Sequence, residues 1–544
     1  DVLRGGDEPV EVALKLAGAK ELVLGVDDGG DGPPYDHADW AEARYTTLED
    51  HTRFLDELDE GALATERGRF PFSFTYKGRS TNDFLPEWTS GLSVIENTAD
   101  YVLTREVFPE PTGGLVMTWE VKRFKRFPAV DWVLYFESRT VETGLIENIR
   151  VLDSAVGAPR PGEEPYLLYR TNGAPSTPED FEFETLPVTV SEARKLVAKG
   201  GRSSNGDFPF FKLDMAGGSL VGAIGWSGQW DAHFSCPSQR VLKLDAGMEL
   251  THFKLVPGEH VRSPRILLMH WAGDTWEANS AFRELLYQHY CVHREDKPPL
   301  PMLFCNTCFT RGGGWLNECN AENQISLIHA YAPLGLEALL TDAGWFTGGW
   351  PMGAGNWDAR KDAYPDGMGP VAQAALDKEM IYGLWYEPER VMAGTTAHRE
   401  HPEWLLKSQP GEESTYLLDF GLPEVQRYFF DIVADYMKLP GFRFYRQDFN
   451  MDPLPYWRHT DKEDRQGITE MKYVEGLYAY WEALRKAWPD IVMEEGESEG
   501  GGIDLEPPGR RARNKKPDSW FDADVARKGF WAPCRFLPKN SFVG

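Results

Sequence analysis

Short runs of alternating hydrophobic and polar residues dominate the first half of the chain. They recur at residues 70–76, 101–108, 115–124, 129–141, 219–226, 248–256 and 265–271, separated by Gly, Pro and Asp. Alternation with a period of two places successive side chains on opposite faces of a strand, and many closely spaced strands are typical of an antiparallel sandwich. We therefore expect a large antiparallel β-sandwich domain over residues 1–294.

The pattern changes after a helical segment at residues 275–290 and a Pro-rich linker at 295–301. Apolar strands are expected at residues 302–307, 336–345, 381–389, 442–449 and 491–497, with amphipathic helices between them at 322–332, 371–378, 425–437 and 474–487. Repeated strand–helix units with a polar or aromatic residue at almost every strand end are typical of a (β/α)8 TIM barrel. We expect such a barrel over residues 302–544, with its active site at the strand ends.

Charge excludes two classes of partner. The formal net charge is −28 over 544 residues, so a nucleic acid or an anionic membrane surface would be repelled. No run of 18 apolar residues occurs, so we expect a soluble protein, and the sequence leaves the cytoplasm and secretion equally open. Aromatic residues make up 13% of the chain, which permits a carbohydrate site because aromatic rings stack on sugar faces.

The cysteines predict neither a disulfide framework nor a metal centre. There are six of them, and the single CxxC, Cys305 to Cys308, has no second pair or nearby His. We interpret this pair as core or active-site lining. No metal and no cofactor are expected.

The most informative segment is residues 445–453, which closes a strand-like run. Arg446, Asp448 and Asn450 are two apart, so all three would face one cavity if the strand continues. The arginine would keep Asp448 ionised, and Asn450 could bond a substrate hydroxyl. A solvated surface turn is the alternative for such a triplet taken alone.

Sequence motifs along nearly the whole chain are similar to those of one enzyme family. They lie at the expected strand ends (341–346, 383–391 and 446–450), in the acidic segment after Val492, and at 364–368, 401–406, 417–425, 464–470 and 502–506, with first-domain motifs at 73–80, 223–230 and 247–259. In this order they resemble the retaining, melibiase-like α-galactosidases of glycoside hydrolase family 36. The resemblance implies an N-terminal β-supersandwich followed by a catalytic barrel, which would be incomplete at its C-terminal end.

The resemblance also implies which residues carry the chemistry. Asp448 matches the family's nucleophile. Two carboxyls roughly 5 Å apart are needed for retention, one ionised to attack and one protonated to release the leaving oxygen. An ungapped alignment places Asp518 at the acid/base position, and Asp522 and Asp524 are the alternatives if the loop carries an insertion.

Substrate contacts carry over in part. Asp342 matches the first of the family's paired aspartates, whereas the second is replaced by Ala343. Arg446 stands where the family has a basic residue that supports the nucleophile and binds the sugar, and Asn450 matches as well. Trp345 and Trp385 are candidates for the wall of the site or for stacking on the sugar, with core packing as the competing interpretation. The remaining candidates lie in segments that depart from the family's pattern and make the pocket acidic: Gly496, Glu497, Ser498 and Glu413.

The expected function is therefore retaining hydrolysis of terminal α-linked galactose from oligosaccharides or glycoconjugates. One alternative is an α-galactosaminidase or α-N-acetylgalactosaminidase type of specificity, because Glu497 or Glu413 could pair with an amino sugar. A second alternative is an inactive carbohydrate-binding relative, since the lead-in to Asp518 is altered. The expected partner is a small carbohydrate, and the resemblance makes a homo-oligomer one option.

Overall fold

The computed structural model describes most of the chain after residue 70. Described are residues 44–46, 52–54, 70–156, 166–174, 177–215, 218–238, 241–293, 302–309, 316–495, 501–506, 513–515, 529, 531–539 and 542–543. Two compact units are distinguished, residues 1–61 and 62–544. In the first, strands β1 (Arg44–Thr46) and β2 (Thr52–Phe54) form an antiparallel pair.

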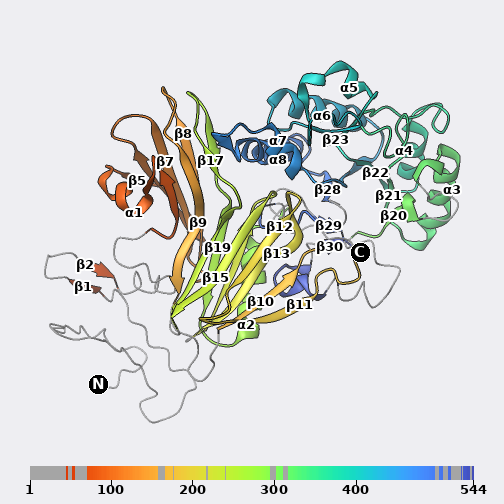
Figure 1. Cartoon of the computed structure of the whole chain (residues 1–544). Helices are drawn as coiled ribbons and strands as arrows, with labels where there is room; N and C mark the ends of the chain where they lie inside the picture. The colour runs from red at the N-terminus through yellow and green to blue at the C-terminus, as the bar shows by residue number, and fades with distance from the viewer. Residues whose placement is uncertain are drawn as a thin grey trace, which may run out of the picture. The chain divides into compact units, whose positions relative to one another are not determined.

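An extensive antiparallel sheet system fills the first half of the second unit (Figure 1). Its strands are β3 (Ser73–Tyr76), β4 (Arg79–Ser80), β5 (Gly91–Asn97), β6 (Tyr101–Pro109), β7 (Leu115–Phe124), β8 (Ala129–Ser138), β9 (Ile146–Val156), β10 (Tyr166–Asn172), β11 (Phe183–Val188), β12 (Arg194–Lys199), β13 (Arg202–Met215), β14 (Gly218–Gly225), β15 (Trp230–Ser238), β16 (Val241–Met248), β17 (His252–Phe253), β18 (His260–Arg262) and β19 (Arg265–Trp271). Helix α1 (Thr81–Phe84) follows β4, and helix α2 (Thr275–His289) packs on β14 and β19.

Buried apolar side chains of these strands form the core of the sandwich. In β8, Trp132 and Leu134 are buried among other large apolar side chains of the core. The Trp132 indole Nε1 donates to the main-chain oxygen of Val151 on β9 at 2.7 Å, so a core side chain also satisfies its polar group. The predicted antiparallel sandwich is confirmed.

Seven parallel strands follow in sequence order within the described part of the chain. They are β20 (Phe304–Asn306), β21 (Ala338–Thr341), β22 (Ile381–Tyr386), β26 (Phe442–Gln447), β28 (Val492–Glu495), β29 (Arg513–Lys515) and β30 (Phe542–Val543). Every residue of β21 is buried, as expected for a parallel strand covered on both faces. Helices alternate with these strands (Figure 1): α3 (Ala321–Tyr331), α4 (Gly369–Leu376), α5 (Thr396–Glu400), α6 (Pro423–Tyr436), α7 (Leu454–Thr460) and α8 (Ile468–Ala487).

Some elements of this half differ from the predicted pattern. A small antiparallel sheet of β23 (Arg390–Met392), β25 (Thr415–Leu418) and β24 (Leu405–Leu406) interrupts the strand–helix alternation. Helix α7 was also not predicted, because a seven-residue helix shows barely two turns of periodicity. The parallel strands end earlier than expected, since the polar ends of the apolar runs leave the ladder and form loops.

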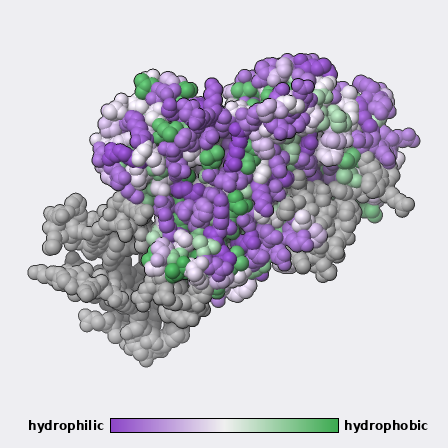
Figure 2. Space-filling view, viewed as in Figure 1, coloured by the Kyte–Doolittle hydropathy of each residue, from purple (hydrophilic) through white to green (hydrophobic). Residues whose placement is uncertain are grey.

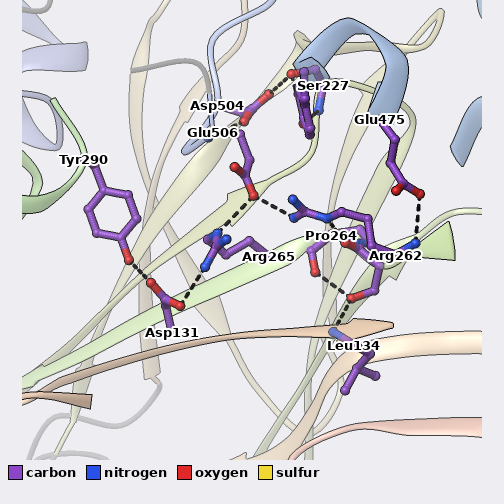
Figure 3. Close-up of polar contacts among 12 residues, drawn as sticks. Asp131, Leu134, Ser227, Arg262, Pro264, Arg265, Tyr290, Glu475, Asp504 and Glu506 are labelled. Atoms are coloured by element: carbon purple, nitrogen blue, oxygen red, sulfur yellow. Dashed lines mark hydrogen bonds and ion pairs between the residues drawn. The ribbon is translucent and has the colours of Figure 1, made fainter. Parts of the chain in front are cut away.

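Buried polar contacts join the sandwich strands to the segment after β28 (Figure 3). The Glu506 carboxylate contacts two guanidinium groups, Arg262 Nη2 at 2.6 Å and Arg265 Nε at 3.0 Å. Arg265 also pairs with Asp131 at 2.8 Å, and Asp131 accepts a hydrogen bond from the Tyr290 hydroxyl. The segment at residues 501–506 is therefore held by charged residues of the sandwich.

The visible surface is mostly hydrophilic (Figure 2), as expected for a chain with many charged residues. On the face shown in Figure 2, hydrophilic residues predominate and the hydrophobic patches are small. Within the described residues, none of the helices is both long and apolar enough to cross a membrane.

Candidate active site

The register of the parallel strands brings the predicted strand-end residues to one level. Trp385 on β22 is paired with Arg446 on β26, and Arg446 is paired in turn with Glu494 on β28. A carboxylate follows directly on the end of three of these strands: Asp342 after β21, Glu387 after β22 and Asp448 after β26. Loops after parallel strands meet at the same edge, so these carboxylates share the end of the barrel where active sites form.

Asp448 is held on both carboxylate oxygens and is only 6% exposed. Its Oδ2 accepts hydrogen bonds from Trp385 Nε1 at 3.1 Å and from Asn450 Nδ2 at 2.9 Å, and its Oδ1 accepts from the main-chain nitrogen of Phe449 at 2.9 Å. Its main-chain nitrogen donates to the main-chain oxygen of Tyr386 at 2.8 Å. N–H donors on both oxygens stabilise a negative charge and fix the direction of the carboxylate.

Glu387 is a buried carboxylate that the sequence analysis did not assign. It accepts hydrogen bonds from Trp350 Nε1 at 2.9 Å, Arg390 Nε at 2.8 Å and the main-chain nitrogen of Asn450 at 2.7 Å. Burial raises the pKa of Glu387, the nearby Arg390 guanidinium lowers it, and the charge of Asp448 raises it. In the sequence, the feature that could have identified Glu387 as a site residue is its position directly after an apolar strand, within the motif at residues 383–391.

Arg390 and Glu387 together hold the loop that carries Asp448. Arg390 Nη2 donates to the main-chain oxygen of Asn450 at 2.6 Å, while Glu387 accepts from the nitrogen of the same residue. Asn450 is thereby fixed through both main-chain polar groups, and its side chain is directed at Asp448. The predicted proximity of Asn450 and Asp448 is found in the structure, and the amide of Asn450 contacts the carboxylate itself.

Arg446 is buried and lies beside a buried carboxylate on the next strand. Its Nη1 is 3.6 Å from Glu494 Oε1, and both side chains are almost fully covered. A close pair of opposite charges in a low-dielectric environment is strongly coupled. The expected support of Asp448 by Arg446 stays a prediction.

The other described candidates differ in their surroundings. Asp342 is buried, and its Oδ2 accepts from Asn306 Nδ2 at 2.7 Å while its Oδ1 accepts from the nitrogen of Ala343 at 2.8 Å. Trp345 is fully buried and its Nε1 donates to the Trp385 oxygen at 2.8 Å, so its environment is that of a core residue supporting Trp385. Glu413 is exposed in the loop before β25.

The remaining candidates lie outside the described residues. They are the three pocket residues Gly496, Glu497 and Ser498 and the three acid/base candidates Asp518, Asp522 and Asp524. Cys305 is buried and Cys308 is partly exposed.

Comparison with known proteins identifies related catalytic domains. The Melibiase family model matches residues 312–507, which include every described candidate above, and the NPCBM/NEW2 domain model matches residues 1–46. The chain is 24% identical to the α-galactosidase Mel36A of Lactobacillus acidophilus over 351 residues, which are 60% of this chain and 47% of the relative. It is 25% identical to α-galactosidase C of Emericella nidulans over 332 residues, or 56% and 42% of the two chains. The chain thus spans about half the length of the curated relatives it matches.

Solved structures share the fold over most of the chain. The family 36 α-galactosidase AgaA of Geobacillus stearothermophilus, in complex with raffinose, superposes with a TM-score of 0.73 at 17% identity, covering 87% of this chain and 68% of that one. An α-galactosidase from Lactobacillus brevis also gives a TM-score of 0.73 at 17% identity, covering 92% and 67%. Residues 312–507, which include the strand ends around Asp448, therefore match the Melibiase family, and the supersandwich followed by a barrel is the fold of the α-galactosidases of glycoside hydrolase family 36.

Proposed function

We propose that the protein hydrolyses terminal α-galactosides with retention of configuration and that Asp448 is its nucleophile. The observation that carries the proposal is the buried Asp448 carboxylate at the end of β26, with N–H donors on both oxygens. A nucleophile in this chemistry must be negatively charged and precisely directed, and N–H donors on both oxygens favour each of these properties. The reported relatives are all named α-galactosidases, which supports the same activity.

The proposed substrates are oligosaccharides or glycoconjugates that end in α-linked galactose. The related AgaA has been crystallised with raffinose and with stachyose, which supports this class of small carbohydrate.

We further propose the domain boundaries expected from the sequence, with a sandwich domain at residues 1–294, a linker at 295–301 and the catalytic barrel at 302–544. A homo-oligomer is proposed from the family resemblance, and light scattering of the purified protein tests it.

The reaction proceeds in two displacements. In the first, an Asp448 oxygen bonds to the anomeric carbon while the bond from that carbon to the glycosidic oxygen breaks, and the acid/base carboxyl gives its proton to the departing oxygen. In the second, the same acid/base takes a proton from water, the water oxygen bonds to the anomeric carbon, and the bond to Asp448 breaks. Asp518 is the proposed acid/base, with Asp522 and Asp524 as the alternatives.

Release of p-nitrophenol from its α-galactoside tests the nucleophile. Asp448→Ala should lower kcat by about 10⁴-fold, because the covalent step then has no attacking group. Asp435→Ala is the matched control, since Asp435 is an exposed aspartate on α6 and should leave activity unchanged. Azide should restore turnover to Asp448→Ala and give the β-galactosyl azide, because the small anion attacks from the face that Asp448 vacates. Full activity of Asp448→Ala would refute the proposal.

The acid/base is tested by changing the leaving group. Loss of a general acid slows substrates with poor leaving groups much more than aryl glycosides, which need little protonation. Asp518→Ala should therefore lose raffinose hydrolysis while retaining much of its activity on the aryl galactoside. If Asp522→Ala or Asp524→Ala shows this pattern instead, the assignment moves to that residue.

The comparisons do not favour the two alternative functions. Every relative reported is named an α-galactosidase, and none is named for an amino sugar or for binding alone. Parallel assays on the p-nitrophenyl α-galactoside and α-galactosaminide, with Glu497→Gln beside the wild type, measure the specificity directly. A preference for the galactosaminide that Glu497→Gln abolishes would reverse this conclusion.

A further inference from the structure

An open groove lies between α2, the start of β11 and the segment that contains the 3₁₀ helix η8 (Pro533–Arg535). It encloses about 590 Å³, within the range of sites for small ligands. Helix α2 contacts η8, and residues of α2, β11 and η8 line the groove together. Helix α2 and strand β11 are labelled in Figure 1. None of the residues that line the groove belongs to the candidate active site.

Two large aromatic side chains of the groove are unusually exposed. Trp276, in the first turn of α2, is 63% exposed, and Trp531 is 59% exposed. Burying a tryptophan ring releases far more free energy than burying a small side chain, so two exposed rings on one groove indicate a surface that something covers. Flat apolar rings at hydrogen-bonding surfaces are the groups on which sugar rings stack.

Three cationic side chains line the same groove. The Arg535 guanidinium lies 3.7 Å from the ring centroid of Phe183 and 5.7 Å from that of Trp276, and the Lys539 ammonium lies 5.3 Å from the Trp531 ring. Arg283 donates to the main-chain oxygen of Cys534 at 3.0 Å. In the described part of the chain, none of these three cations forms an ion pair.

The positive charge is notable because the protein as a whole is acidic. The formal net charge is −28, yet the lining contains three cations and one carboxylate, that of the exposed Glu182. Burial lowers the pKa of Arg535, which means that the guanidinium is partly removed from water. A partly desolvated cation gains most from an anion that arrives with its own hydrogen-bond acceptors.

A buried amide completes the wall of the groove. Asn279 is only 5% exposed, and its Oδ1 has no hydrogen-bond partner within the described residues. A buried acceptor without a donor costs about 1–3 kcal/mol, so an incoming hydroxyl group would satisfy it. Asn279 sits on α2 one turn from Trp276 and Arg283, so the amide, the ring and the cation share one face of the helix.

We propose that this groove is a second carbohydrate site that binds a saccharide bearing a carboxylate. A sugar ring stacks on Trp276 or Trp531, its carboxylate pairs with Arg535, and one hydroxyl donates to Asn279. A nucleic acid would also present rings and negative charge, but its regularly spaced phosphates would be repelled by the acidic surface outside the groove. The site is independent of the proposed hydrolysis, because its residues take no part in that chemistry.

Calorimetric titration with trigalacturonic acid tests the proposal, with the neutral trisaccharide maltotriose, which has no α-galactose, as the comparison ligand. The wild type should bind trigalacturonate at least tenfold more tightly than it binds maltotriose, and added salt should weaken the binding. Arg535→Gln and Trp276→Ala should each weaken trigalacturonate binding by tenfold or more. Arg427→Gln is the matched control, because Arg427 is an exposed arginine on α6 and should not change the affinity.

The measurement separates this site from the catalytic one. Arg535→Gln and Trp276→Ala should hydrolyse the p-nitrophenyl α-galactoside like the wild type, and Asp448→Ala should bind trigalacturonate like the wild type. The proposal is overturned if trigalacturonate shows no saturable binding, if both groove variants bind it as tightly as the wild type, or if a short oligothymidylate displaces it from the groove. The Asn279→Ala variant should bind trigalacturonate more weakly than the wild type while it keeps a normal unfolding transition, and this result would support the amide contact directly.

Discussion

The indole nitrogen of Trp385 donates a hydrogen bond to Asp448 Oδ2 at 3.1 Å, across neighbouring parallel strands. The two residues are 63 positions apart in the sequence, and both are buried. Trp385 thus contributes an N–H to the carboxylate. The main-chain oxygen of Trp385 in turn accepts from Trp345, so a second tryptophan fixes the first.

Trp385→Phe tests the role of this hydrogen bond. The phenyl ring keeps most of the apolar contact but removes the donor to the carboxylate, and a hydrogen bond to a charged group contributes about 1.5–3 kcal/mol. We expect kcat on the p-nitrophenyl α-galactoside to fall by about 10- to 100-fold, with a smaller change in KM. Trp119→Phe is the matched control, because the Trp119 indole nitrogen, in the sandwich, has no hydrogen-bond partner in the described residues. Equal losses in the two variants would contradict the role assigned to Trp385.

Glu387→Gln tests whether the buried Glu387–Arg390 pair holds the Asp448 loop. The substitution preserves the shape but leaves the Arg390 guanidinium beside a neutral amide, and breaking a buried pair from one side costs about 3–5 kcal/mol. Urea unfolding should show this loss, and kcat should fall because Asn450 loses a charged acceptor. Glu403→Gln, at an exposed glutamate, should change neither quantity measurably. Unchanged stability of Glu387→Gln would show that the pair does not hold the loop.

Glu506→Gln tests the contacts that fix the segment after β28. Glu506 is the shared partner of Arg262 and Arg265, so removing its charge leaves two guanidinium groups with reduced compensation (Figure 3). We expect a loss of about 3–5 kcal/mol in the free energy of unfolding, and faster amide exchange at residues 501–506. Glu137→Gln removes an exposed pair with Arg139 and should cost less than about 1 kcal/mol. Amide exchange as slow as in the wild type would argue against this role.

Glu470 predicts a pH dependence of stability. Burial raises the pKa of Glu470 from 4.5 to about 7. Hydrogen bonds from Trp226 Nε1 and the main-chain nitrogen of Gln229, both at 2.8 Å, lower this pKa but do not offset the burial. Between these two values the folded state holds a proton that the unfolded state has released, so stability is full below pH 4.5 and falls as the pH rises to about 7. At about 1.36 kcal/mol per pKa unit, the loss is about 3 kcal/mol.

Glu470→Gln isolates this contribution. The amide oxygen can accept the same two hydrogen bonds but carries no charge at any pH, so the variant should lack this pH-dependent loss. The wild type and the variant should have similar unfolding free energies near pH 4.5, and the variant should be more stable above pH 7. Chemical unfolding at a series of pH values measures the difference, in which the contributions of other titrating groups cancel. A constant difference across the series would contradict the raised pKa.

Much of the fold was predictable because its signals are local. The period of two in β7 and β8, and the apolar runs of β21, β22 and β26, appear in any short window of sequence. The helices α3, α4 and α6 begin and end within two residues of the predicted ranges. The short sheet of β23, β24 and β25 was missed because its strands have two to four residues, too few to show a period.

The sequence by itself determined that Asp448 stands at the end of a buried strand, because the apolar run before it is a local signal. Since β26 ends at Gln447, the contact of Asn450 with Asp448 depends on the loop that follows the strand. Only the tertiary structure decided which groups meet Asp448 from outside its own strand. Trp385 and Glu387 come from β22 and the residue after it, and Glu494, the partner of Arg446, comes from β28. The register between strands follows from packing of the whole barrel, and no short window of sequence contains that information.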